Sequence, residues 1–178
     1  MKKVLIISTS LHNGSNSELL AKAFKDGAEA AGNDVALISL KGKNIAFCKG
    51  CFACQSLGNC VIKDDANQII ETMKKADVIV WATPVYYYSM SGQMKTLIDR
   101  ANALYSSDCR FTEVYGLITA TEDELDTPKG TIKGIQGWVD CFENVELKDV
   151  LFVGGVTDPN DMKDNEGLLK AYRMGQKI

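Results

Sequence analysis

Five short apolar runs, spread along the chain, constrain its fold more than any other feature of the sequence. They cover residues 4–7, 35–38, 78–82, 114–118 and 150–153. Within each run the apolar residues do not alternate with polar ones, which is typical of parallel strands buried on both faces. Amphipathic helical stripes lie between and after the runs. This alternation predicts one domain, residues 1–178, built as a doubly wound α/β sheet of five parallel strands with helices on both faces.

The fourth helical stripe has a recognisable start. Thr127 is a suitable N-cap, and Pro128 suits the first helical position because an N–H there would have no intrahelical partner. Ile135 and Trp138 belong to its apolar face. Cys141 follows on the same helix, where we expect a small buried residue.

Charge and apolar content exclude several classes of protein. Hydrophobic residues make up 46% of the 178 residues and charged residues 24%, with a net charge of −3. That charge provides no broad attraction to nucleic acid or to an anionic membrane. No apolar run approaches the roughly 18 residues of a membrane span, and no cleavage signal follows the short apolar start. We therefore expect a cytoplasmic protein with no nucleic-acid or membrane partner.

The first apolar run leads directly into a loop rich in hydroxyl and amide groups. Residues 8–17 read Ser-Thr-Ser-Leu-His-Asn-Gly-Ser-Asn-Ser, and a helical stripe follows at once. The first N–H groups of a helix lack intrahelical partners, and the helix dipole favours an anion there. The alternative is simple capping, because Ser15 and Glu18 match a capping box. One cap does not require so many donors, so the loop predicts a phosphate-type ligand.

Two further loops should meet this serine-rich loop, because ligands of doubly wound sheets bind beyond the carboxyl ends of the strands. Residues 83–93 contain three consecutive tyrosines, Tyr86, Tyr87 and Tyr88, whose flat faces suit a planar ring. Residues 119–121, Thr-Ala-Thr, follow the fourth run. Packing or dimer contacts are the alternative role for the tyrosines. Beside an anion loop, they favour a ligand with a phosphate at one end and a ring at the other.

Missing motifs narrow the choice of this ligand. No G-x-G-x-x-G follows the first run, which argues against a Rossmann dinucleotide site, and no Walker loop is present. Serines and asparagine without lysine suit a single terminal phosphate, so flavin mononucleotide (FMN) fits best. The single histidine, His12, lies inside the anion loop, which makes a Ser-His-Asp hydrolase a weak alternative.

These residues resemble the flavodoxin-like NAD(P)H-dependent FMN reductases. The similarity is carried by residues 7–10, 15–17, 83–86 and 90–95, followed by an Asp-Arg pair at 99–100. It implies a flavodoxin-like sheet with strand order 2-1-3-4-5 and assembly as a homodimer or homotetramer. The phosphate would be held by the hydroxyl and amide side chains, and the ring by the second and third loops. The implied cofactor-binding residues are Ser8, Ser10, His12, Ser15, Asn16, Ser17, Thr83, Pro84, Val85, Tyr86, Tyr87, Met90, Gly92, Thr119, Ala120 and Thr121.

Four of the six cysteines are clustered: Cys48, Cys51, Cys54 and Cys60. Their spacing is similar to the compact motif of the iron–sulfur flavoproteins, a branch of the same family. Four thiolates at such spacing can hold a [4Fe–4S] cluster; a zinc ion or free thiols without metal are the alternatives. Because this segment follows the second apolar run, we expect it beside the same strand ends as the flavin.

The expected activity is that of an FMN oxidoreductase. It would accept hydride from NAD(P)H and pass electrons to a flavin, a quinone, another small acceptor or a protein, with a cluster as a further carrier. The chemistry belongs to the cofactor, so no catalytic side chain is expected. Two alternatives from other classes are a non-enzymatic carrier like flavodoxin, docking on protein partners, and a flavin-sensing regulator.

Overall fold

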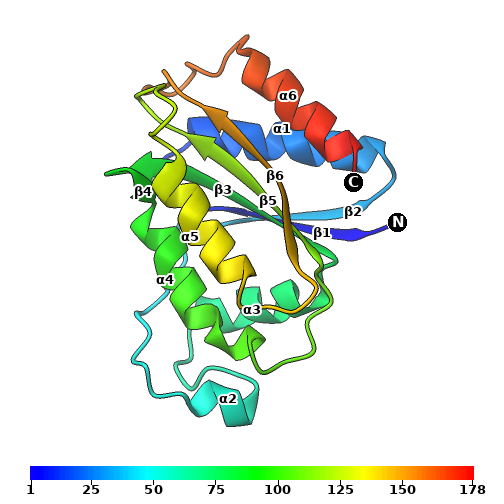
Figure 1. The fold of residues 1–178 in the computed structure, drawn as a ribbon, viewed down its shortest axis with the longest axis vertical. Helices are drawn as coiled ribbons and strands as arrows, with labels where there is room; N and C mark the ends of the chain where they lie inside the picture. The colour runs from blue at the N-terminus through cyan, green and yellow to red at the C-terminus, as the bar shows by residue number, and fades with distance from the viewer.

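A parallel sheet forms the centre of the molecule, and helices cover both of its faces (Figure 1). The computed structural model describes residues 1–178. The parallel strands, in the order β2-β1-β3-β5-β6, are β1 (Lys3–Ser8), β2 (Asp34–Ser39), β3 (Val78–Tyr86), β5 (Glu113–Thr119) and β6 (Glu146–Val153). The two-residue strand β4 (Ser89–Met90) pairs antiparallel with the end of β3. When only the five parallel strands are numbered in chain order, their order in the sheet is 2-1-3-4-5. The predicted strand order is therefore confirmed.

The helices lie in two groups, one on each face of the sheet. One face carries α1 (Asn16–Ala30) and α6 (Glu166–Gln176); the other carries α3 (Asp65–Lys75), α4 (Gly92–Arg100) and α5 (Lys129–Val139). A short α2 (Ala53–Leu57) lies between β2 and α3, and a 3₁₀ turn, η1 (Ala101–Leu104), continues α4. No helix is both long enough and apolar enough to span a bilayer.

Alternate residues of the central strands enter two separate cores. Leu5 and Ile7 of β1 belong to the core beneath α3, α4 and α5, whereas Val4 and Ile6 belong to the core beneath α1 and α6. Burial on both faces is therefore confirmed for the central strands. It is wrong for β2 and β6, which are half exposed because each has a neighbour on one side only.

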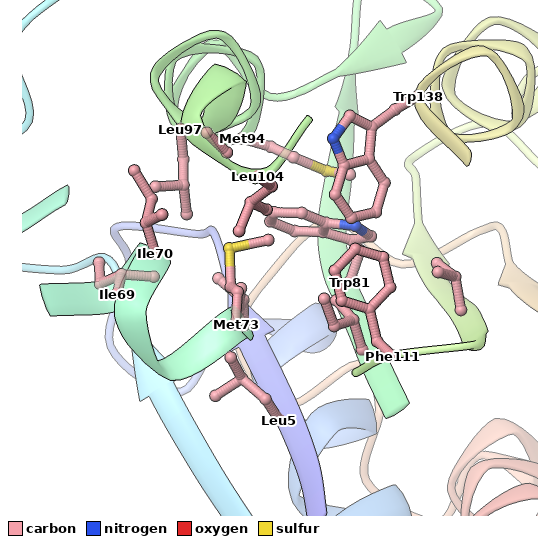
Figure 2. Packing of buried hydrophobic residues seen from close by; sticks show 14 of the residues in the cluster. Leu5, Ile69, Ile70, Met73, Trp81, Met94, Leu97, Leu104, Phe111 and Trp138 are labelled. Atoms are coloured by element: carbon pink, nitrogen blue, oxygen red, sulfur yellow. The ribbon is translucent and has the colours of Figure 1, made fainter. Parts of the chain in front are cut away.

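Aromatic rings fill the larger core, as Figure 2 shows. Trp81 of β3 meets Trp138 of α5 edge to face, with ring centroids 5.5 Å apart, and Phe111 stacks on Trp138 at 5.7 Å. Such pairs add to the free energy gained by burying the rings. They fix α5, and therefore the end of that helix, against the sheet.

Close contact between α1 and α6 depends on glycine. A Cβ at Gly27 would lie 2.0 Å from the carbonyl oxygen of Tyr172, and a Cβ at Gly175 would lie 2.1 Å from that of Phe24. The two helices therefore touch backbone to backbone along the C-terminal half of α1.

Helix α5 starts one residue later than predicted. Pro128 is its N-cap, rather than the first helical residue, and makes no side-chain capping bond.

Candidate functional site

A cleft of about 340 Å³ lies beyond the carboxyl ends of the strands. Its walls come from the carboxyl ends of β3 and β5 and from the segments that follow β1, β5 and β6. The residues that line it are Ser10, His12, Ser15, Asn16, Ser17, Pro84, Val85, Tyr86, Thr119, Ala120, Thr121, Val156, Thr157, Asp158 and Pro159. The three loops that the sequence predicted to converge therefore share one cleft.

The serine-rich loop directs the N-terminus of α1 into this cleft. Ser15 caps the helix, and its Oγ accepts a hydrogen bond from the Glu18 N–H at 3.3 Å. Ser17 follows in the first turn, with its Oγ 3.5 Å from that of Ser15. No lysine or arginine lines the cleft. An anion here would be bound by free N–H groups, the helix dipole and neutral hydroxyls.

Asn16 joins this helix to the opposite wall. Its Nδ2 donates to the carbonyl oxygen of Asp158 at 3.2 Å, while its Oδ1 is buried without a hydrogen-bond partner. The Asp158 loop is itself ordered by Asp161, whose Oδ2 accepts from the N–H groups of Thr157 and Asp158, both at 2.8 Å. Asn16 therefore presents an unpaired acceptor within a site that is otherwise rich in donors.

Buried hydroxyl groups hold the first and second loops together beneath the cleft. The Ser91 Oγ donates to the Thr9 Oγ1 at 2.9 Å, and Thr9 donates to the carbonyl oxygen of Ala82 at 3.1 Å. The Thr83 Oγ1 accepts from the Ser91 N–H at 3.2 Å. Thr83, predicted to bind the cofactor, therefore supports the loop and does not line the cleft.

The four clustered cysteines line a second cavity, of about 410 Å³. Cys54 is carried on α2, and the backbone at Gly50 and Gly58 has φ of 63° and 66°, which glycine adopts readily. The cavity wall also includes Trp138 and Phe142 from the end of α5. The sulfurs share this cavity, but no three Cys, His, Asp or Glu residues are grouped closely enough to hold a metal ion.

Side chains from neighbouring helices hold the cysteine loop. Asn102 of η1 donates through Nδ2 to the Cys54 Sγ at 3.3 Å. Asn67 of α3 donates to the Cys60 carbonyl oxygen at 2.9 Å, and the Lys74 Nζ donates to that of Gly58 at 2.7 Å. The loop is therefore a bound part of the fold.

The cysteine cavity and the strand-end cleft lie at opposite ends of α4 and share no residue. Gly92 starts that helix beside β4, and Arg100 ends it in the wall of the cysteine cavity; nine residues span about 14 Å. Figure 1 shows α2 at the end of the molecule away from β4. The expectation that the cysteine loop lies beside the same strand ends as the cleft is therefore wrong within one chain, because the loop passes along the helical layer to the other end of the sheet.

Comparison with known proteins agrees with this architecture. The sequence model of the family described as NADPH-dependent FMN reductase matches residues 2–123. The chain belongs to this family. Membership makes it an NAD(P)H-dependent FMN oxidoreductase, and the matched region runs from β1 through the loop after β5.

Several relatives of this FMN reductase are named iron–sulfur flavoproteins. One from Methanocaldococcus jannaschii is 30% identical, over 99% of this chain and 95% of that protein. Another, from Archaeoglobus fulgidus, is 36% identical over 56% of this chain and 45% of that protein. Among solved structures, an NAD(P)H:quinone oxidoreductase from Methanothermobacter marburgensis superposes with a TM-score of 0.76 at 19% identity, covering 99% of this chain and 95% of that one. That identity supports the shared flavodoxin-like fold alone.

Not every residue predicted to bind FMN reaches the cleft. Ser8 is buried on β1 and its Oγ has no partner. Met90 packs into the larger core, and Gly92 borders another hollow beside Gln93. Tyr87 is fully exposed. The short hairpin between β3 and β4 places Tyr87 and Met90 outside the cleft that Tyr86 borders.

The same hairpin holds two tyrosines in an unusual backbone conformation. Tyr87 and Tyr88, with φ of 49° and 59°, form its two-residue turn. A turn with two positive φ values normally contains asparagine and glycine. Tyr86, at the end of β3, precedes this turn and borders the cleft.

The fourth wall of the FMN reductase cleft was not predicted from the sequence. Residues 156–159, Val-Thr-Asp-Pro, follow β6 and line the cleft. The signal that could have found it is the place of β6 in the sheet, because β6 is the fifth parallel strand and its carboxyl end lies at the same edge as the others.

The prediction that Cys141 is buried is wrong. Cys141 follows the last turn of α5, where it is exposed and lines the cavity of the four clustered cysteines. Cys109 is half buried, and burial raises the pKa of its thiol.

Proposed function

We propose that this FMN reductase holds FMN in the strand-end cleft and passes electrons from NAD(P)H to a small acceptor such as a quinone or a flavin. The observation that carries the proposal is the N-terminus of α1, which opens among hydroxyl side chains into a cleft that Tyr86 also borders. An anion with an attached planar ring matches both features.

The phosphate end is supported by the chemistry of the lining groups. Ser10, Ser15 and Ser17 supply hydroxyl donors around the free N–H groups of the first turn of α1. The unpaired Oδ1 of Asn16 is an acceptor and would repel a phosphate oxygen, but it suits a hydroxyl group of the ribityl chain. The cleft therefore fits a phosphate followed by a polyhydroxyl chain.

The ring end is supported by Pro84, Val85 and Tyr86 on one side and residues 119–121 on the other. These groups would orient the ring and exclude water from one of its sides. Bound FMN supplies the hydride-accepting chemistry, and the chain supplies binding and orientation.

We further propose that the cysteine loop holds a [4Fe–4S] cluster. Support comes from four thiols that line one cavity, from its largely apolar wall, and from relatives that are named iron–sulfur flavoproteins. Bringing the sulfurs onto one group requires the loop to move, and Gly50 and Gly58 allow this. Zinc is less well supported, because four-cysteine zinc sites typically pair two separated C-x₂-C turns.

Purification without oxygen tests both proposals. The protein should contain one FMN per chain, and NADH or NADPH should bleach its visible absorption, with reoxidation by an added quinone or flavin. Iron and sulfide should be present at about four each per chain. A flavin that no nicotinamide reduces would favour the electron-carrier alternative. Zinc, or no metal, would overturn the cluster and leave the flavin assignment standing.

A further inference from the structure

The strand-end cleft contains one side chain that can carry a positive charge near neutral pH. No lysine or arginine lines the cleft, whereas His12 lines it together with Ser10, Ser15 and Ser17. His12 is also the single histidine of the chain. Histidine is the residue whose ordinary range of charge change lies between pH 5 and 8. A full positive charge in this cleft therefore depends on the imidazole of His12.

The backbone of His12 is attached to a fixed part of the loop. The Thr9 N–H donates to the Ala82 carbonyl oxygen at 2.9 Å, and Ser10 is only 4% exposed. The Ser10 Oγ accepts from the His12 N–H at 3.3 Å. Residues 11–14 that follow are exposed. His12 therefore sits on the exposed rim of the cleft, directly after a buried and hydrogen-bonded segment.

The imidazole of His12 has no partner within the chain. Its backbone N–H takes part in a hydrogen bond, but its ring does not. None of the ion pairs of the chain includes His12. The charge of a protonated ring is therefore not already neutralised by a bound carboxylate, and both ring N–H groups are available to a ligand.

The surroundings of this ring are acidic. The other ionisable residues at or behind the walls of the cleft are Asp158, Asp161, Glu18, Lys22 and Tyr86. Lys22 is paired with Glu18 at 2.8 Å, so Asp158 and Asp161 remain as unpaired charges. With a neutral His12, the side chains around the cleft would thus disfavour a second negative group. A protonated His12 offsets part of this repulsion.

We propose that His12 is the pH-dependent counter-charge of the FMN phosphate, so that the cleft binds FMN more tightly as the pH falls from about 8.5 to about 6.5. The inference rests on the FMN site of the proposed function. A phosphate monoester carries a charge of about −1.5 to −2 at pH 7, since its second pKa is about 6. In this range both partners are charged. Binding then moves one proton from solvent onto the imidazole, and no other bond forms or breaks.

The first test compares FMN with riboflavin, which has the same ring and ribityl chain but no phosphate. Both are titrated into flavin-free protein at several pH values by fluorescence. The dissociation constant of FMN should rise about tenfold between pH 6.5 and pH 8.5, the effect of losing one charge-assisted hydrogen bond. That of riboflavin should stay constant. Added salt should reduce the change for FMN, because the ring is exposed.

Two substitutions separate the charge from the hydrogen bond. His12→Gln keeps a neutral donor, so it should bind FMN at every pH as weakly as wild type does at pH 8.5. His12→Arg keeps a charge that is independent of pH, and it should bind FMN tightly throughout. Lys25→Gln is the matched control, because it removes a positive charge from α1 at a residue that pairs with Glu29 outside the cleft. This variant should show the wild-type pH dependence.

The second test measures proton uptake by calorimetry. At pH 7.5, the FMN binding enthalpy of wild type should vary with the ionisation enthalpy of the buffer, because the bound imidazole takes up part of a proton. The variation should be absent in His12→Gln and His12→Arg, and with riboflavin. A histidine that only shapes the loop would produce no such difference.

The outcomes distinguish the inference from the proposed function. Protein that binds FMN at no pH, or binds riboflavin as tightly as FMN at every pH, overturns the proposed phosphate site. Tight FMN binding with the same pH dependence in wild type and His12→Gln overturns the role of His12 and leaves the flavin site standing. Proton uptake that persists in His12→Gln would likewise exclude the imidazole as its source.

Discussion

The side chain of Asn16 donates a hydrogen bond to the backbone carbonyl oxygen of Asp158, 3.2 Å away, and so ties the first turn of α1 to the loop after β6. Two segments distant in the sequence are therefore joined across the cleft.

Removing polar groups from the α1 side of the cleft should weaken FMN binding. The double change Asn16→Ala and Ser17→Ala deletes two neutral groups, each contributing about 1 kcal/mol net. The dissociation constant for FMN, measured by fluorescence titration, should rise at least about tenfold. Ser56→Ala, on the exposed α2, is the control and should bind FMN as wild type does. Unchanged affinity in the double variant would contradict the proposed position of the phosphate at the N-terminus of α1.

Neighbouring tyrosines should differ in their effect on the flavin. Tyr86 borders the cleft, whereas Tyr87 is fully exposed. We expect Tyr86→Ala to change flavin fluorescence and slow NAD(P)H oxidation, and Tyr87→Ala to do neither. Both proteins should unfold cooperatively. An equal effect from the two changes would mean that the hairpin closes over the ligand.

Relieving the strained turn should stabilise the protein. Replacing Tyr87 and Tyr88 by Asn-Gly supplies the residues that a turn with two positive φ values favours. A gain of about 1 kcal/mol would raise the melting temperature by about 2–4 °C in a chain of this size. Tyr105→Gly serves as the control, because the backbone there has φ of −58°, and should lower it.

Stability at low pH should depend on Asp77. Hydrogen bonds from the Lys3 N–H, and then from Arg110, lower the pKa of its carboxyl group despite partial burial. A lowered folded-state pKa contributes stability above the ordinary aspartate value of about 3.9, and this contribution is lost as the pH falls through the folded-state pKa. Denaturant titrations should therefore show less loss of stability below pH 4 in Asp77→Asn than in wild type. Asp26→Asn, on the exposed face of α1, should retain the wild-type slope.

Changing one clustered cysteine should remove metal without removing flavin. The cysteine cavity and the cleft share no residue, so Cys51→Ser should lose its iron and its reduction of one-electron acceptors while keeping FMN. Cys109→Ser, which does not line that cavity, should keep both. Loss of FMN in Cys51→Ser would contradict the separation of the two sites.

Local sequence patterns predicted the five parallel strands and three walls of the cleft, because buried parallel strands and a donor-rich helix start leave strong signals. The strand order came from the resemblance to the FMN reductase family. The direction of the cysteine loop could not be predicted in this way. It is decided by contacts with Arg100, Asn102 and Lys74, which are distant in the sequence. The exposure of Tyr87 could not be predicted from the sequence either, because asparagine and glycine, the usual signals of such a turn, are absent from it.

The attachment of the cysteine loop has a consequence for where changes in the chain are felt. Asn67, Lys74 and Asn102 bind residues 54–60 to α3 and η1, so a change in the length or sequence of this loop acts on that helical layer. The strand-end cleft shares no residue with the cysteine cavity, and the two ends of the molecule can therefore accept substitutions independently of each other.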